Sequence, residues 1–153
     1  MRREAAQKRT PQKIPASGTP AAGTVEYART CHRHMAGWFG VAITDALEKR
    51  EILVVEDAHS YRVTPVGIRW FETSMGIVVP TPVSSPKSSQ NKIAVRCLDG
   101  TERRPHLAGW LGRALYQRFL ERKWVLPIQG SRALRVTSQG KTQLGKLLGL
   151  PPA

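Results

Sequence analysis

The apolar residues of the chain form two long stripes with the spacing of a helix. Within each stripe apolar side chains recur at steps of three and four, the pattern of a helix that buries one face. The stripes predict two long amphipathic helices, over about residues 35–49 and 107–121. Their apolar positions are Met35, Trp38, Phe39, Ala42, Ile43, Ala46 and Leu47, and then Leu107, Trp110, Leu111, Ala114, Leu115 and Phe119.

Each long helix is followed by a pattern that predicts a hairpin and a further helix. Short apolar runs separated by polar turn residues indicate paired strands after each helix. Thr64 before Pro65, and Thr137 in the second half, are hydroxyl residues suited to cap a helix N-terminus. We also expect a short helix before each long one. The expected strands cover residues 52–55, 61–63, 124–126 and 133–136, and the expected short helices cover 25–32 and 91–98.

The two halves share more than their periodicity. The stretch HMAGWFG begins at His34, and HLAGWLG begins 72 residues later at His106. YRVTPVG, from Tyr61, matches LRVTSQG, from Leu134, after one extra residue. Shared Trp, Gly and Arg-Val-Thr residues go beyond the similarity of two amphipathic helices, so we infer an internal duplication. The paired glycines are expected to let each long helix pack closely on the helix before it.

These elements predict a mainly α fold with small β-hairpins, built as two tandem winged-helix-like units. In each unit the long helix takes the recognition position of a helix-turn-helix, and the hairpin is the wing. Residues 25–79 form the first unit and residues 91–150 the second. A disordered basic arm is expected over residues 1–24, and a linker rich in Pro and Ser over residues 80–90.

Charge distinguishes the two copies. The 153-residue chain has a net charge of +13, but the first copy, residues 31–79, has five Lys and Arg against six acidic residues. Residues 93–153 have eleven against three. A basic second copy favours a polyanion partner, most often nucleic acid, although a solvated surface is the alternative. The candidate DNA-contacting residues surround the second long helix and wing: Arg103, Arg104, Arg113, Arg118, Arg122, Lys123, Arg132 and Arg135.

Other features of the sequence argue against several classes of protein. No apolar run is long enough to span a membrane, and the charged N-terminus lacks the apolar region of a secretory signal. We therefore expect a cytoplasmic protein whose two cysteines are reduced thiols. The chain contains no phosphate-binding loop, nucleophile elbow or zinc-protease motif, so we expect no enzyme. Asp99 and Glu102, close to His106, are interpreted as turn and helix-start residues.

The cysteines raise the alternative of a metal site. Cys31, His32, His34 and Cys97 carry the side chains that soft or borderline metal ions prefer. They could meet if the segments before the two long helices packed together. However, no Cys-x-x-Cys spacing is present, and a free cysteine is commonly a small buried apolar residue. No cofactor is therefore predicted, and these four residues are kept as candidate metal ligands.

Long motifs of the chain resemble a known family. ARTCHRHMAGWFGVAITDAL, YRVTPVG, CLDGTERRPHLAGWLGRALYQRFLERKWVL and SRALRVTSQGKTQLGKLLGL, in this order, are similar to the C-terminal part of a subgroup of ArsR-type winged-helix transcriptional regulators. The resemblance covers about residues 28–150. Such regulators normally carry a complete DNA-binding winged helix before this region, and nothing in residues 1–27 resembles one. The chain is thus expected to be either a part of such a regulator or a stand-alone form.

Two functions follow from these observations. The first is an ArsR-type transcriptional regulator, acting as a homodimer, whose basic second copy and N-terminal arm bind double-stranded DNA through its phosphates. The alternative is a dimerisation or effector-sensing module of such a regulator that does not itself read DNA. Salt dependence separates them, because a protein that neutralises several phosphates loses affinity steeply as salt rises.

Overall fold

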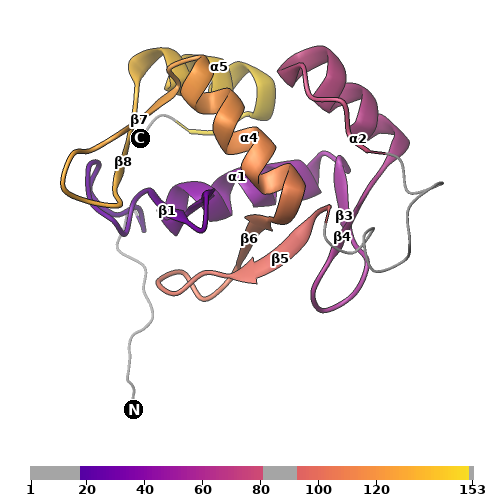
Figure 1. Cartoon of the computed structure of the whole chain (residues 1–153), viewed down its shortest axis with the longest axis horizontal. Helices are drawn as coiled ribbons and strands as arrows, with labels where there is room; N and C mark the ends of the chain where they lie inside the picture. The colour runs from indigo at the N-terminus through magenta and orange to yellow at the C-terminus, as the bar shows by residue number, and fades with distance from the viewer. Residues whose placement is uncertain (1–17, 81–92, 152–153) are drawn as a thin grey trace.

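The computed structural model describes residues 18–80 and 93–151, and the two copies seen in the sequence have the same order of elements. Each copy consists of a hairpin, a long helix, a second hairpin and a further helical segment (Figure 1). The first copy contains β1 (Arg29–Cys31), β2 (His34–Ala36), α1 (Gly37–Lys49), β3 (Leu53–Val55), β4 (Tyr61–Val63), α2 (Pro65–Trp70) and the π-helical turn η1 (Phe71–Met75). The second contains β5 (Val95–Leu98), β6 (Pro105–Ala108), α4 (Gly109–Glu121), β7 (Val125–Pro127), β8 (Leu134–Val136) and α5 (Ser138–Leu148).

The short helices expected before the long helices are wrong. Residues 29–31 and 95–98, which fall in those predicted helices, are strands that pair with the segments directly before α1 and α4. His32 and Arg33 have φ angles of 48° and 71°, as the two central residues of a type I′ hairpin turn do. This turn folds Arg29–Cys31 back onto His34–Ala36, so their backbone groups bond across a ladder instead of along a helix.

This difference also overturns the predicted fold class. The described residues contain eight short strands in four antiparallel hairpins beside their helices, so the fold is not mainly α. Within residues 18–80 and 93–151, a strand and not a helix lies directly before each long helix, and the helix-turn-helix expected in each copy is therefore not formed there. The hairpins that follow the long helices and the capped last helices lie where the sequence predicts them. The long helices do so too, except that each begins two residues later than predicted, because Met35 and Leu107 belong to strands β2 and β6.

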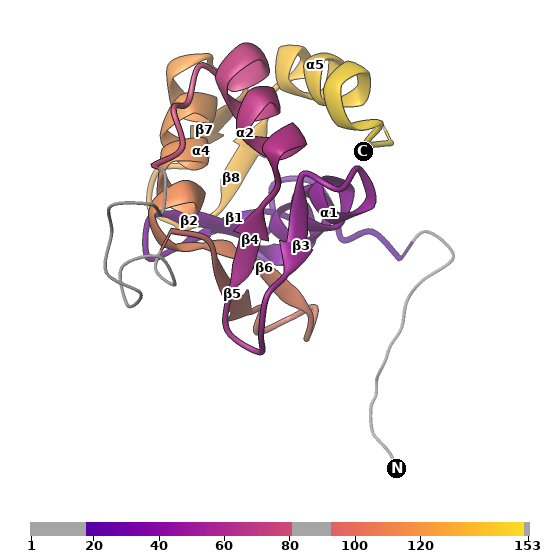
Figure 2. The ribbon, with the colours of Figure 1, turned by 90° about the vertical axis from the view of Figure 1, so that its right-hand side faces the viewer.

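The two copies are interlocked by backbone hydrogen bonds. The second hairpin of each copy continues onto the first hairpin of the other copy. Thr30 donates to the carbonyl of Arg132 at 3.0 Å, and Arg96 donates to the carbonyl of His59 at 2.9 Å. The two bonds occupy equivalent places in the repeat. Figure 2 shows part of this arrangement, in which β3 and β4 of the first copy lie beside β5 and β6 of the second, below α2, α4 and α5.

Each long helix also packs against a strand of the other copy. Helix α1 packs on β6 of the second copy, and α4 packs on β2 of the first. At one of these contacts the backbone N–H of Leu107 donates to the buried hydroxyl of Thr44 at 2.8 Å. Each long helix therefore depends on the other copy for part of its packing.

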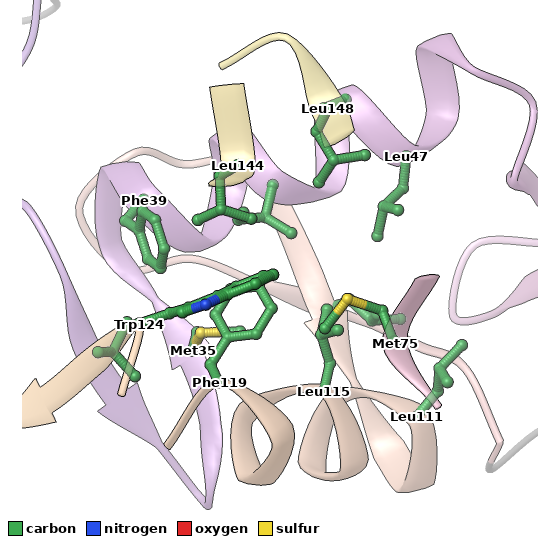
Figure 3. Packing of buried hydrophobic residues seen from close by; sticks show 14 of the residues in the cluster. Met35, Phe39, Leu47, Met75, Leu111, Leu115, Phe119, Trp124, Leu144 and Leu148 are labelled. Atoms are coloured by element: carbon green, nitrogen blue, oxygen red, sulfur yellow. The ribbon is translucent and has the colours of Figure 1, made fainter. Parts of the chain in front are cut away.

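A single hydrophobic core results from this exchange. Side chains of both copies meet in it, and the close-up shows Phe39 and Phe119 approaching across the boundary between the copies (Figure 3). The ring centroids of these two residues lie 6.3 Å apart. The labelled core residues are Met35, Phe39, Leu47, Met75, Leu111, Leu115, Phe119, Trp124, Leu144 and Leu148.

The repeated Ala-Gly-Trp-x-Gly pattern follows from the junction between strand and helix. Gly37, at the start of α1, has a φ of 80°, which side-chain-bearing residues rarely adopt. A Cβ on Gly40 would lie 2.5 Å from the carbonyl oxygen of Met35, so only glycine fits at this approach. The glycines therefore allow close packing as expected, but against the preceding strand and not against a helix. Trp38 stacks on Tyr27 with ring centroids 5.5 Å apart.

Some expectations fall on residues outside the described part of the chain. Residues 1–17 of the expected arm and residues 81–90 of the expected linker lie outside the described residues, so both assignments stay predictions. Among the described residues, no helix has the length and apolar character needed to cross a membrane.

Candidate functional site

Two cysteines and two histidines meet where the first hairpins of the two copies come together. Cys31 and His34 are direct cross-strand partners in the β1–β2 hairpin, and Cys97 and His106 are partners in the β5–β6 hairpin. One ligand atom from each of the four side chains can be chosen so that all lie within 4.8 Å of one another. Both histidines are buried and both cysteines are partly buried. Each copy thus contributes one thiol and one imidazole to a single cluster, which we call the Cys/His cluster.

The two histidines approach each other directly. The Nε2 atoms of His34 and His106 are 3.0 Å apart, and the side chain of His106 is almost completely buried. Burial, and then the charges of His106 and His32, lower the pKa of His34 to about 4. The His34 ring is therefore neutral at pH 7, which is the form that binds metal ions.

The two thiols are also neighbours. Burial, followed by the proximity of Cys31, raises the pKa of Cys97 to about 11. Both cysteines are free thiols in the structure. A thiol with a raised pKa is a poor nucleophile at neutral pH unless a positive charge stabilises its thiolate. The environment of Cys97 thus favours a structural or metal-binding role over catalysis.

A buried carboxylate supports the cluster from the second copy. Asp99 Oδ1 lies 3.0 Å from His106 Nδ1, accepts a hydrogen bond from Arg29 at 3.2 Å, and accepts another from the backbone N–H of Gly37 at 2.7 Å. Burial acts to raise the pKa of Asp99, but hydrogen bonds from His106, Glu102, Gly37 and Thr101 outweigh it and hold the pKa well below its usual range. Asp99 therefore joins the cluster to the first copy at Arg29 and at the start of α1.

The sequence identified most of this site, but not all of it. Cys31, His34 and Cys97 are in the cluster, whereas His32 is exposed in the hairpin turn and takes no part. His106 replaces it, and the repeat carried the signal, because His34 and His106 begin the two matching motifs. Asp99 is a turn residue as interpreted, since its carboxylate accepts from the backbone of Thr101 and Glu102. Its contacts with Arg29 and Gly37 join segments at least 62 residues apart.

The predicted DNA-contacting residues form two overlapping groups. Four of them make side-chain contacts within the chain: Arg104 pairs with Asp45, Arg118 pairs with Glu121, Arg122 donates to the carbonyl of Ser74, and Arg132 donates to the carbonyl of Thr30. Arg132 and the remaining four are exposed, and these five lie at the β5–β6 turn, along α4 and at its end, and on the β7–β8 hairpin. They are Arg103, Arg113, Lys123, Arg132 and Arg135.

Arg103 and Arg104 do not lie at a helix N-terminus, as the sequence suggested. They are in the turn between β5 and β6, and α4 begins later, at Gly109. The strand before α4 is buried at Leu107 and Ala108, and the first turn of the helix buries Leu111 and Gly112. The N-terminal end of α4 is therefore directed into the molecule.

Open grooves flank the two long helices at equivalent places. One, of about 740 Å³, lies between α1 and the end of α5 and is lined by residues that include Trp38, Asp45, Arg50 and Leu148. Its counterpart beside α4, lined in part by Trp110 and Ile77, has a volume of about 260 Å³. Both grooves are shaped by residues of the two copies.

These features define a module of two copies in which polar side chains from both halves meet at a buried centre. The chain is 34% identical over 126 residues to YdfF of Bacillus subtilis (strain 168), an uncharacterized HTH-type transcriptional regulator. The alignment covers 82% of this chain and 53% of YdfF. The chain is therefore similar to part of an HTH-type transcriptional regulator, and this similarity supports the expectation that it is not an enzyme.

The chain spans about half the length of this relative. No protein-family model matches the chain. No solved structure matches it either.

Proposed function

We propose that the chain acts in an ArsR-type DNA-binding transcriptional regulator, and that its described residues form the regulatory module and not the part that reads DNA. The observation that carries this proposal is the hairpin that stands in place of the first helix of a helix-turn-helix. In that motif the first helix crosses the DNA backbone, and the N-terminal residues of the second contact base edges. Here a β-hairpin precedes each long helix, and the start of α4 is buried.

The interlocked copies support a regulatory role. A signal that changes the centre of the module acts on both copies at once, because each long helix packs on a hairpin of the other copy. Such a two-part body is suited to couple the binding of an effector to the orientation of attached segments. The homodimer expected from the sequence is part of this proposal, and light scattering of the purified protein checks it.

A second candidate function is direct binding of duplex DNA by the second copy. Its support is the set of five exposed cations and the excess of eleven Lys and Arg over three acidic residues in residues 93–153. Exposed cations on a hairpin and a helix can contact phosphates without reading bases. This function predicts binding that depends on charge, and it does not require a recognition helix.

Fluorescence anisotropy across a salt series distinguishes the two functions. The protein is titrated into a labelled duplex from the upstream region of its own gene, and into a scrambled duplex of the same length. We expect equal and weak binding to both, lost between about 50 and 200 mM salt, as for contacts to phosphates alone. Tighter binding to the upstream duplex that persists at physiological salt would contradict the proposal and establish the second copy as a reader.

A matched pair of variants shows whether any binding uses the predicted cations. Arg135 in β8 and Arg62 in β4 occupy the same place in the two copies, and both are exposed. If Arg135 contacts a phosphate, Arg135→Gln reduces the slope of log affinity against log salt by about 0.9, and Arg62→Gln leaves it unchanged. Equal effects of the two variants would indicate general attraction to the protein's charge.

A further inference from the structure

The two histidines of the Cys/His cluster, His34 and His106, face each other through their Nε2 atoms. Nδ1 of His106 lies 3.0 Å from the ionised carboxylate of Asp99, so this nitrogen carries the proton and donates it. The Nε2 atom of His106 is then an unprotonated acceptor in the neutral ring, and it lies 3.0 Å from Nε2 of His34.

A hydrogen bond between the two Nε2 atoms would satisfy the histidines alone, but it gives no role to the two thiols beside them. All four ligand atoms lie within 4.8 Å of one another. In a tetrahedral zinc site, bond lengths of about 2.0–2.1 Å to nitrogen and 2.3 Å to sulfur place two nitrogens about 3.3 Å apart and two sulfurs about 3.8 Å apart. A shift of about 0.3 Å between the two imidazoles would therefore accommodate the ion.

The surroundings of the cluster are those of a metal site. A histidine that binds a metal usually donates its other ring N–H to a carboxylate or a backbone carbonyl, which fixes the ring and its tautomer. Asp99 accepts this hydrogen bond from His106. Each hairpin supplies its Cys and His as cross-strand partners, so the ligands are positioned by backbone pairing and not by flexible loops.

We propose that Cys31, His34, Cys97 and His106 bind one Zn²⁺ ion, which links the first hairpins of the two copies. Two thiolates and two imidazoles in tetrahedral geometry form a donor set that zinc prefers. Binding replaces the two thiol protons by the metal ion, so two protons are released and no electron is transferred. This site goes beyond the proposed regulatory function, and its existence does not depend on that function.

Titration of the reduced, metal-free full chain with Co²⁺ tests the site. Co²⁺ reports tetrahedral thiolate ligation by its visible and near-ultraviolet absorption. We expect one equivalent per chain, the absorption of a two-sulfur, two-nitrogen site, and displacement of Co²⁺ by one equivalent of Zn²⁺. Cys97→Ser and His106→Gln are expected to lose this spectrum. Because losing even a supporting hydrogen-bond partner lowers metal affinity by about 10–100-fold, losing a ligand lowers it by more than about 100-fold.

His59→Gln is the matched control, because His59 is an exposed histidine of the same chain that lies outside the cluster. It is expected to bind Co²⁺ as the unsubstituted protein does. Circular dichroism shows whether each variant is folded.

Thiol reactivity is a second readout that needs no variant. Cys31 and Cys97 are free and only partly buried, so we expect both to react with a thiol reagent in the metal-free protein. One equivalent of Zn²⁺ is expected to slow both reactions at least tenfold. Absence of a Co²⁺ spectrum together with unchanged thiol reactivity would overturn the proposal and leave a direct hydrogen bond between the histidines. Metal binding that persists in Cys97→Ser, or a Cys31–Cys97 disulfide that forms in place of metal binding, would overturn it as well.

Discussion

Replacing Asp99 with alanine is expected to lower the free energy of unfolding by about 3–5 kcal/mol, the usual cost of breaking a buried ion pair from one side. The side chain of Asp99 is fully buried, and that of its partner Arg29 is only 9% exposed. The substitution leaves the Arg29 guanidinium without its partner carboxylate and the Gly37 N–H without its acceptor. Both groups belong to the other copy, so the loss falls on the junction between the copies. Urea unfolding, monitored by circular dichroism, measures the change in the free energy of unfolding.

Asp45→Ala is the matched control for this substitution. Asp45 also pairs with an arginine, Arg104, but the two side chains are 41% and 56% exposed. Exposed pairs contribute about 0–1 kcal/mol, so Asp45→Ala is expected to change stability by no more than that. Equal effects of the two substitutions would show that the contacts of Asp99 do not hold the copies together.

Replacing Phe119 with alanine is expected to cost about 3–5 kcal/mol of stability, because it opens a cavity at the centre of the core. Phe119 is 1% exposed, and its ring lies 5.2 Å from that of Trp124 and 6.3 Å from that of Phe39. Phe39 belongs to the first copy and Phe119 to the second. The cavity therefore removes contacts within one copy and between the two.

A double-mutant cycle isolates the contact between the copies. Phe39→Ala, Phe119→Ala and the double variant are unfolded in urea, and a coupling energy of about 0.5–1.5 kcal/mol is expected for this aromatic pair. Val66→Ala serves as control, because Val66 is 51% exposed and an exposed substitution changes stability by about 0.5 kcal/mol or less. Additive effects of the two phenylalanine substitutions would argue against packing between the copies.

The parts of the fold that sequence could predict are those determined locally. Helices α1 and α4 follow from their apolar period, and α2 and α5 begin at Thr64 and Thr137, whose side chains accept from the backbone of Gly67 and Gly140. The first hairpins were missed because they are too short for an alternating pattern to show. Their strands are three or four residues long, and the turn at His32 and Arg33 lacks the glycine or asparagine that marks most type I′ turns.

The exchange between the copies could not be predicted from either copy alone. The bond from Thr30 to Arg132 joins residues 102 positions apart, and no local pattern specifies such a partner. The same applies to the Cys/His cluster, whose residues the sequence supplied without their arrangement. The four residues form one cluster only because the β1–β2 and β5–β6 hairpins lie side by side in the folded chain. The repeat offered one usable guide, since it pairs His34 with His106.

The predicted DNA surface shows a different limit of sequence reasoning. A count of charges does not distinguish a cation that is available to bind a phosphate from one that already contacts another group of the protein. Arg122 illustrates this, because its guanidinium donates to the carbonyl of Ser74 and lies over the ring of Trp124. Such arginines bind the two copies to each other, and part of the positive charge of the second copy therefore stabilises the fold.

The most direct test of our central claim, that the two copies form one folded body, is differential scanning calorimetry of the full chain and of two variants. Phe39→Ala weakens the first copy and Phe119→Ala the second. We expect a single transition in all three proteins, equal calorimetric and van't Hoff enthalpies, and a shift of the whole transition to lower temperature in both variants. Two transitions, of which each variant moves only its own, would contradict the claim and show that the copies unfold as separate domains.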